Sequence, residues 1–360
     1  MTADHASPTD SLGDAFDRVG RRLAWVVLLI VIALSGASWW FGFEPGPAIR
    51  YGPLIASLVL LGLPHGAVDH LVPARLAATS PPLSMAIVGL VYAGLGGLYL
   101  GLWLVAPLPA ALLFIAITWF HWGQGDVHAL VAFVEARPLK SRARRIGTLV
   151  VRGGLPMLVP LVAFPERYRA VIEAWLALFV GEANLAWALT EELRAMLGGG
   201  LLLITVATLA SGYHATGPTR GWRVDAGETV LLWAYFLVVP PLVAIGVYFT
   251  VWHSLRHIFR LAALDEPGAS TGTRFKRFAA DATPLTLLAI AVLAGFWVVV
   301  PITPTSVPGL VALYLVFIAV LTLPHVAVVS WMDARGGLWA ERVGRSLTTK
   351  AADTGPSDSD

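Results

Sequence analysis

Histidine is the residue type in this sequence whose placement points most directly to chemistry. Seven of the nine histidines lie in four short segments, within or beside long apolar stretches without charged residues. Ionisable residues at such places are rare, and they usually mark a functional interior. The four segments are 63–70, 120–128, 252–257 and 324–325, and their histidines are His65, His70, His121, His128, His253, His257 and His325.

Helical phase indicates which of these side chains act together. His253 and His257 are four residues apart, so one helix face presents both imidazoles, a spacing that suits two ligands of one ion. His65 and Asp69 have the same spacing. We expect Asp69 to accept the second N–H of an imidazole rather than to bind the ion, and Asp126 to do the same from another helix.

These placements together predict a metal site with four histidine ligands. A hydrogen bond between helices explains any single histidine equally well, but it explains the whole set poorly. The predicted ligands are His65, His121, His253 and His257, and the residues predicted to lie behind them are Asp69, His70, Asp126, His128 and His325.

The available ligand types restrict the metal. The sequence has no cysteine, so nitrogen and oxygen must hold the ion, which excludes iron–sulfur clusters and thiolate zinc sites. Imidazole ligands suit iron, copper or zinc. Neutral imidazoles leave coordination positions open for a small molecule such as O₂, and no His-Glu-x-x-His motif supplies a general base. Redox chemistry is therefore favoured over hydrolysis.

Aromatic residues flank the histidine segments. Core packing or an interfacial belt explains each of them separately, but together they are able to line an apolar slot for a long substrate. The predicted slot residues are Trp119, Phe120, Trp122, Phe249 and Trp252.

The elements that position these residues are predicted to be membrane-spanning helices. The chain has 57% hydrophobic and 13% charged residues, whereas about 25% of the residues in soluble domains are charged. A span needs about 20 apolar residues, so the uncharged stretches 83–125 and 282–332 must each hold two. A net charge of +2 gives no sign of nucleic-acid binding. We predict an all-α, polytopic transmembrane bundle of about 8–10 spans, with the histidine site between helices.

Ten spans result when the stretch 227–263 is divided at Pro240 and Pro241, because proline interrupts a helix. The helices with His65, His121, His253 and His325 then run in one direction, and these residues share a depth of about 18–24 Å from the helix starts. The predicted spans are 22–43, 47–72, 83–106, 108–133, 145–164, 196–214, the two halves of 227–263, 283–303 and 309–333.

Loop charge predicts the orientation in the cell membrane. The loops 134–145 and 264–280 are rich in Lys and Arg, so we place them and both termini in the cytoplasm. The histidines then meet in the cytoplasmic half of the membrane. Segment 168–195 carries scattered charges and is predicted to be interfacial. The predicted organisation is a polar N-terminal segment 1–21, a catalytic domain 22–333 and a disordered polar tail 334–360.

The histidine segments, in their order along the chain, resemble those of the Brp/Blh family of membrane β-carotene 15,15′-dioxygenases from archaea and bacteria. The resemblance extends from about residue 50 to residue 333. It rests on Pro64–His70, on Phe120 and His121 with Asp126, on Trp252–His257, and on Pro324 with His325.

This resemblance implies a cofactor and a reaction. The cofactor would be a non-haem Fe(II) ion with His65, His121, His253 and His257 as ligands. The reaction would be O₂-dependent cleavage of the central 15,15′ double bond of β-carotene into two molecules of all-trans-retinal. The retinal would then supply a rhodopsin.

Two other classes of membrane protein share some of these features. Di-iron lipid desaturases and hydroxylases cluster more histidines, often as adjacent pairs, whereas here only His253 and His257 have a comparable spacing. A haem-binding or transport protein would use histidine pairs as axial ligands or as part of a pathway. One iron per chain and no Soret band would favour the carotenoid oxygenase over both.

Overall fold

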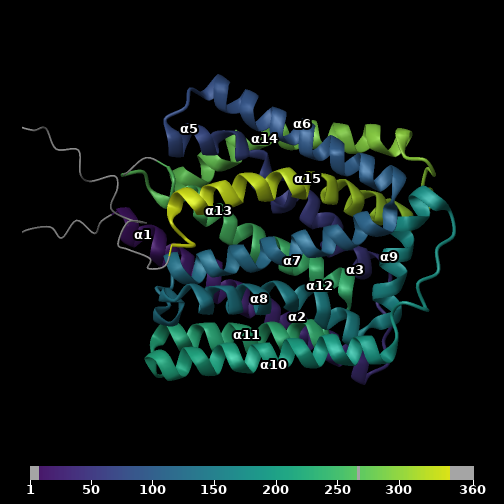
Figure 1. Cartoon of the computed structure of the whole chain (residues 1–360), viewed down its shortest axis with the longest axis horizontal. Coiled ribbons are helices and arrows are strands. Elements are labelled where there is room, and N and C mark those ends of the chain that lie inside the picture. Colours follow the sequence, from purple (N-terminus) through teal and green to yellow (C-terminus); the bar gives the residue numbers. More distant parts are fainter. Residues whose placement is uncertain (1–7, 266–267, 341–360) are drawn as a thin grey trace, which may run out of the picture.

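The computed structural model describes residues 8–265 and 268–340, and in this part of the chain the regular structure is entirely helical. Most of the long helices run side by side, and α9 crosses one end of the bundle (Figure 1). The α-helices are α1 (Pro8–Ala15), α2 (Ala24–Trp40), α3 (Pro47–Ser57), α4 (Leu63–Ala67), α5 (Val72–Ala77), α6 (Pro81–Val105), α7 (Pro107–Ala132), α8 (Arg142–Ala163), α9 (Pro165–Val180), α10 (Glu191–Thr216), α11 (Arg220–Val238), α12 (Pro241–Tyr248), α13 (Leu255–Ala262), α14 (Thr271–Val299) and α15 (Val307–Gly336).

Short segments of other helix types join several of these helices. Two of them, Leu58–Gly62 and Phe249–Ser254, are π-helical and lie just before or around site histidines. A further π-helical segment, Phe16–Leu23, connects α1 to α2. Asp69–Leu71 and Arg137–Lys140 are 3₁₀-helical. Inserted residues of the π type often occur at functional sites.

The sequence marks the helix boundaries with prolines and hydroxyl caps. Proline occupies the first helical position of α3, α6, α7, α9 and α12, where its missing N–H costs no hydrogen bond. The hydroxyls of Thr190, Thr219, Ser270 and Ser306 accept a backbone N–H at the starts of α10, α11, α14 and α15.

Within residues 8–265 and 268–340, eight helical stretches are long and apolar enough to cross a membrane, which agrees with the predicted range of 8–10 spans. Helices α7 and α11 lie among them in the bundle (Figure 1), and they carry the buried polar residues Gln124, Asp126, Asp225 and Glu228. The candidate spans are Leu12–Trp40, Pro47–Ala77, Pro81–Val105, Arg142–Ala163, Glu191–Thr216, Pro241–Ala262, Thr271–Val299 and Val307–Gly336.

The centre of the bundle is held together by very close contact of α7 and α8. A Cβ atom at Gly153 would lie 1.9 Å from the carbonyl oxygen of Trp119, and one at Gly123 would lie 2.2 Å from that of Leu149. Small residues allow this approach of two helix backbones within a membrane. The approach fixes the position of α7, which carries His121 and Asp126.

Both ends of the described chain differ from the predicted polar segments. Within the predicted segment 1–21, residues 8–21 are helical, and the Phe16 ring stacks on Phe133 with 4.4 Å between ring centroids. At the other end, α15 continues to Gly336 and Leu338 is buried. Their apolar side chains explain why these parts pack onto the bundle. Residues 1–7 and 341–360 lie outside the described residues.

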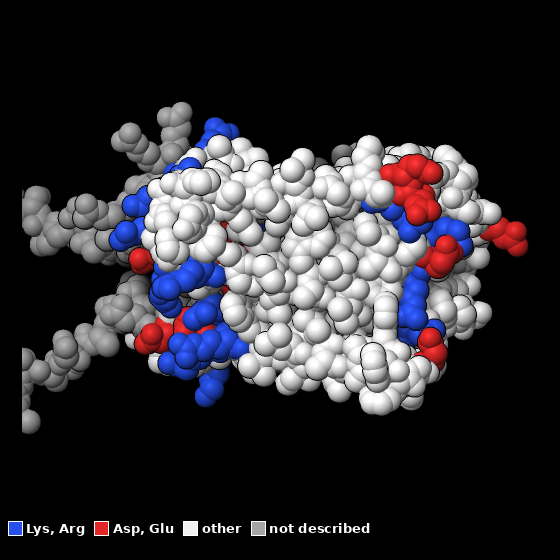
Figure 2. Space-filling model, turned by 90° about the horizontal axis from the view of Figure 1, so that it is seen from below, with Lys and Arg blue, Asp and Glu red and all other residues white. Residues whose placement is uncertain are grey.

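Charged side chains gather at the two ends of the bundle and leave a broad uncharged belt between them (Figure 2). Lys and Arg are concentrated at the end where α1 lies. The opposite end, where α9 crosses, has charges of both signs (Figures 1 and 2). A belt of this kind is what a helix bundle presents to the hydrocarbon region of a bilayer.

Candidate metal centre

Five histidines from four long helical stretches meet inside the bundle: His65 lies in Pro47–Ala77, His121 on α7, His253 and His257 in Pro241–Ala262, and His325 on α15. The ring centroid of His65 lies 5.6 Å from that of His253, 5.5 Å from that of His257 and 5.0 Å from that of His325. The ring centroid of His121 lies 4.7 Å from those of both His253 and His325. All five side chains are buried. The expectation that the histidine segments meet between helices is confirmed.

Three of these histidines offer nitrogens to a single point. One ring nitrogen each of His65, His121 and His325 lies within 4.8 Å of the other two, close enough for one ion between them. The sequence analysis placed His325 behind the ligands, with His70 and His128. The structure instead brings it as close to the centre as the predicted ligands.

The free ring nitrogens also fit a metal ion. The buried Nε2 atoms of His121, His253, His257 and His325 have no hydrogen-bond partner among the described residues. Buried polar atoms nearly always have a partner, so several orphaned nitrogens in one cluster require an explanation. An ion coordinated by neutral imidazole nitrogens supplies one, and the donor set suits iron, copper or zinc.

Asp69 and Tyr92 hold His325 in place. His325 Nδ1 donates to Asp69 Oδ2 over 2.8 Å, and the Tyr92 hydroxyl donates to the same oxygen over 2.7 Å. A carboxylate on one ring nitrogen fixes the imidazole and leaves Nε2 as the donor to a metal. Asp69 was predicted to orient an imidazole, and the imidazole to which it is hydrogen-bonded is that of His325 of α15.

A second set of contacts positions His65 and His253. Gly62 of one π-helical segment faces Phe249 of the other, since a Cβ at Gly62 would lie 2.8 Å from the Phe249 ring. His65 Nδ1 donates to the carbonyl oxygen of Leu61 over 3.2 Å. The two π-helical segments touch here, and the rings of His65 and His253 lie 5.6 Å apart in an edge-to-face arrangement.

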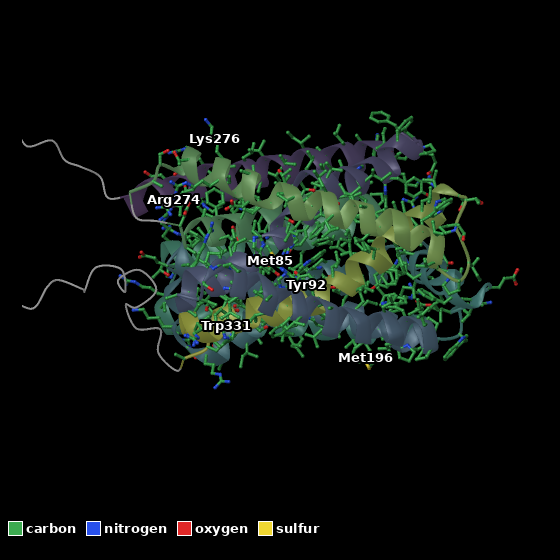
Figure 3. All side chains as sticks on the ribbon, turned by 90° about the horizontal axis from the view of Figure 1, so that it is seen from above. Met85, Tyr92, Met196, Arg274, Lys276 and Trp331 are labelled. Atoms are coloured by element: carbon green, nitrogen blue, oxygen red, sulfur yellow. The ribbon has the colours of Figure 1, made fainter. Side chains whose placement is uncertain are left out.

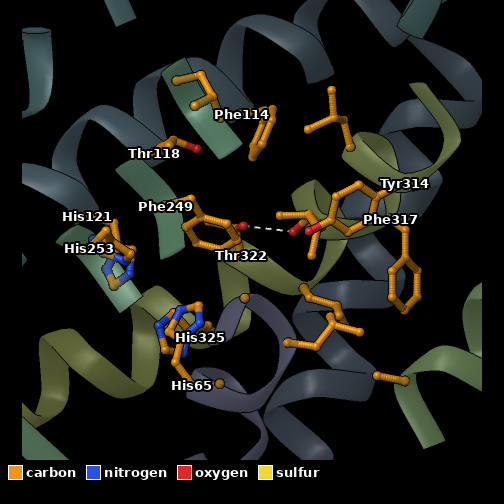
Figure 4. A pocket seen from close by; sticks show the side chains of 18 of the residues that line it. His65, Phe114, Thr118, His121, Phe249, His253, Tyr314, Phe317, Thr322 and His325 are labelled. Atoms are coloured by element: carbon orange, nitrogen blue, oxygen red, sulfur yellow. Dashed lines mark hydrogen bonds between the residues drawn. The ribbon is translucent and has the colours of Figure 1, made fainter. Parts of the chain in front are cut away.

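The histidines line one side of an apolar cavity of about 700 Å³. His65, His121, His253 and His325 all contribute to its wall (Figure 4). On the far side from the histidines lie Tyr314 and Phe317 of α15, and further lining residues come from α9. His325 and Tyr314 are about 16 Å apart along α15 at 1.5 Å per residue. The cavity therefore suits an elongated apolar ligand with one part beside the histidines.

A family model described as beta-carotene 15,15'-dioxygenase matches residues 56–333. The probable beta-carotene 15,15'-dioxygenase Blh of Halobacterium salinarum is 46% identical over 330 residues, which are 89% of this chain and 94% of that protein. The probable beta-carotene 15,15'-dioxygenase Brp of the same species is 30% identical over 335 residues, 87% and 91% of the two chains. The chain belongs to this family.

A more distant relative is the beta-carotene 15,15'-dioxygenase of an uncultured marine bacterium, 66A03, which is 26% identical over 205 residues, 56% of this chain and 66% of that protein. No solved structure has a significant match to the chain. The part matched by the β-carotene 15,15′-dioxygenase family model contains all five clustered histidines and begins after α2. The resemblance expected from the histidine segments is therefore confirmed.

The other predicted site residues of this family member lie at various distances from the cluster. His70 lines the cavity, and its Nδ1 donates to the carbonyl oxygen of Ala67 over 3.0 Å. The His128 ring instead lies beside Phe133, with 6.2 Å between centroids. Two turns of α7 separate His128 from His121, so the two rings reach different neighbours.

Asp126 has different partners from those expected. Its oxygens accept hydrogen bonds from Trp252 Nε1 at 2.9 Å, from Arg256 at 3.3 Å and from Arg152 at 3.4 Å. It supports the site through Trp252, the neighbour of His253 in the chain, and not through an imidazole. The expectation failed because spacing along α7 does not reveal which side chains another helix presents.

Arg152 and Arg256 belong to a buried ionic network that the sequence did not reveal. Arg152 donates to Asp225 over 2.9 Å and to Glu228 over 3.2 Å, and Arg256 donates to Glu228 over 2.6 Å. The Arg256 guanidinium also lies 3.7 Å from the centroid of the Trp252 ring. The signals in the sequence were Arg152 within the apolar part of α8, Arg256 between two histidines, and the carboxyl groups Asp225 and Glu228 in the first half of α11.

Two of the five predicted slot residues line the cavity, Trp122 and Phe249. Trp119 faces α8, where its Nε1 donates to the carbonyl oxygen of Val150 over 2.8 Å. Phe120 is 38% exposed on the outside of the bundle, and Trp252 is fully buried in the ionic network. Residues adjacent in a helix point about 100° apart, so Phe120 faces outward, whereas Trp122, on the other side of His121, still reaches the cavity.

Replacing Asp69 by asparagine is expected to lower metal affinity and activity by about 10–100-fold, the usual effect of losing a partner behind a metal ligand. An amide does not fix the His325 ring as a carboxylate does, while its volume is nearly the same. Iron per chain and product formation measure the effect. Tyr92→Phe removes only one donor to Asp69 and should have the smaller effect; equal activity of Asp69→Asn and the unaltered protein would contradict the assigned role.

Proposed function

We propose that this protein uses O₂ to cleave the central 15,15′ double bond of β-carotene into two molecules of all-trans-retinal, at one non-haem iron. The observation that carries the proposal is the histidine cluster in the wall of a long apolar cavity. The names of its relatives, which are 46% and 30% identical over most of the chain, support the same reaction.

The proposed ligands are His65, His121, His253 and His257, as the resemblance to the family implies. His325 is proposed to stand beside them as a fifth nitrogen donor, since its Nε2 is free and Asp69 orients its ring. Bound Fe(II) would supply the ability to bind and activate O₂. The absence of cysteine from the sequence is consistent with an all-imidazole site for such an ion.

The chain's own contribution is to position the polyene and to keep water away from it. The cavity wall is largely apolar, so a polyene replaces water there at no cost in hydrogen bonds. Tyr314, Phe317 and the α9 residues limit how far the substrate extends beyond the histidines (Figure 4). The double bond next to the histidines is the one that reacts, because positioning of the reacting atoms determines regioselectivity.

We also propose that the end bearing α1 faces the cytoplasm and that the protein lies in the cell membrane. Lys and Arg are concentrated at this end (Figure 2), as the positive-inside rule requires. His325 is closer to the end of α15 at Gly336 than to its start at Val307, so the histidines would lie in the cytoplasmic half. The retinal product would be available to a retinal-binding rhodopsin in the same membrane.

Expression of the chain in a bacterial host that accumulates β-carotene tests the proposed function. Loss of the orange colour together with retinal, identified by chromatography, is the expected result. Loss of colour without retinal would indicate cleavage at another bond and would refute central cleavage. Purified protein should contain one iron per chain and show no Soret band; two irons per chain would instead favour a di-iron desaturase or hydroxylase.

A further inference from the structure

The cavity beside the histidines opens on the outer surface of the bundle between α6 and α14. Both helices supply lining residues whose side chains are also exposed. Met85 of α6 is 42% exposed, and Leu288 and Val292 of α14 are 56% and 51% exposed. A side chain that lines a cavity and faces the outside at the same time belongs to the mouth of that cavity.

The way these two helices pack explains the opening. α6 packs mainly against α15, and α14 packs mainly against α4. On α14 the lining residues Leu285, Leu288, Ala289 and Val292 repeat at helical spacing, so one face of the helix forms one side of the mouth. On α6 the opposite side is formed by Met85 together with the small residues Gly89 and Ala93.

The opening lies at the level of the bilayer's apolar region. Met85 and Tyr92 are found near the middle of the bundle's length, whereas Arg274 and Lys276 lie at its charged end (Figure 3). The α6 and α14 spans are among the least buried of the eight candidate spans, with 17% and 11% of their apolar windows buried. The outer faces of both helices are therefore in contact with lipid.

The opening is also close to the histidine cluster. Tyr92 of α6 reaches inward from the helix that borders the mouth, and its hydroxyl donates to Asp69, the partner of His325. A Cβ at Gly66 would lie 3.5 Å from His325 Nδ1 and 3.8 Å from the Tyr92 hydroxyl. A ligand that passes Gly89 and Tyr92 thus arrives directly beside the candidate metal centre.

We propose that the gap between α6 and α14 is a lateral portal through which a long apolar polyene enters the cavity from the bilayer core. The proposal rests on the proposed function, since that function supplies a substrate that dissolves in lipid. Gly89 lines the cavity, and a Cβ at this position would meet no described atom within 4 Å, so a larger side chain would extend into the open space of the portal. Larger side chains at this position obstruct it.

A reversible block at position 89 tests the portal. The chain has no cysteine, so Gly89→Cys provides a single thiol for an apolar benzyl methanethiosulfonate reagent. The thiol forms a disulfide with the benzylthio group, methanesulfinate leaves, and a thiol reductant reverses the reaction. The iron-loaded full-length protein is reconstituted in phosphatidylcholine vesicles that contain β-carotene. If the reductant restores the rate of retinal formation in the same sample, the loss of activity came from a blocked portal and not from a misfolded variant.

Gly97→Cys is the matched control. Gly97 lies on the same helix, is exposed, has no atom within 4 Å of a built Cβ, and is not among the cavity-lining residues. We expect the benzyl group at position 89 to slow retinal formation by about tenfold or more, because entry becomes rate-limiting. The reductant should restore the rate, and the group at position 97 should leave it unchanged. An unchanged rate in the Gly89→Cys variant with its thiol fully modified would overturn the proposal.

A second measurement does not depend on turnover. β-Carotene in the vesicles should slow the modification of the thiol at position 89 relative to the thiol at position 97, because a polyene in the portal covers position 89 alone. Absence of retinal from the unmodified protein, with this protection intact, would refute the proposed function and leave the portal in place. Equal modification of both positions with and without β-carotene would refute the portal.

Discussion

Replacement of His121 by alanine is expected to abolish retinal formation and to remove most of the bound iron. The His121 ring lies 4.7 Å from the rings of both His253 and His325, and one of its nitrogens lies within 4.8 Å of ring nitrogens of His65 and His325. The loss should exceed the roughly 10–100-fold effect of removing a residue behind a ligand. Iron per chain in purified protein and retinal formed in a β-carotene-accumulating host measure the two effects.

His128→Ala is the matched control for this variant. His128 lies on the same helix, but its ring packs beside Phe133 and not in the cluster. It should keep its iron and much of its activity. Full activity and full iron content in His121→Ala would remove His121 from the centre. The same measurements on His257→Ala and His325→Ala show which of these two residues contributes a nitrogen to the metal.

Replacement of Arg152 by methionine is expected to lower the free energy of unfolding by about 3–5 kcal/mol, the usual result of breaking a buried ion pair. The Arg152 side chain is fully buried and bridges Asp126, Asp225 and Glu228. Without it, Asp126 and Glu228 share the guanidinium of Arg256, and Asp225 loses its ion-pair partner. Thermal or denaturant-induced unfolding of the purified protein in detergent measures this loss of stability.

A second replacement separates the charge imbalance from the loss of packing. Arg152→Met combined with Asp225→Asn removes one charge of each sign and should recover part of the lost stability. Arg50→Met provides a comparison at the surface, where the exposed pair with Glu44 is worth about 0–1 kcal/mol at most. If Arg152→Met is as stable as Arg50→Met, the network does not hold these helices together.

Local patterns in the sequence were sufficient to predict the helices and to identify most of the residues that cluster in the structure. Long runs without charged residues indicate membrane-spanning helices, because a charge within the bilayer is costly. This cost applies to each segment separately, so it is visible in the sequence without knowledge of the helix packing. The pair His253 and His257 was recognisable for a similar reason, since a spacing of four fixes two side chains on one helix face. The proline pair at Pro240 and Pro241 marked the break between α11 and α12.

Contacts between helices were beyond the reach of such patterns. The sequence places Asp69 behind a histidine, but only the arrangement of the 3₁₀ segment Asp69–Leu71 beside α6 and α15 makes that histidine His325 and adds Tyr92. The expected role of Asp126 failed in the same way, because α8, α13 and the Trp252 segment together supply its partners. Helical phase gives the direction of a side chain relative to its own helix and not relative to the neighbours.

The sequence by itself determined an all-α membrane protein with histidines suited to a metal, since hydropathy and residue type belong to single segments. The tertiary structure alone decided that five histidines meet, that two of the five proposed aromatic residues line the cavity, and that the cavity opens between α6 and α14. Each of these depends on the relative rotation of separate helices. That rotation is fixed by close contacts such as those at Gly123 and Gly153, which form only when the bundle assembles.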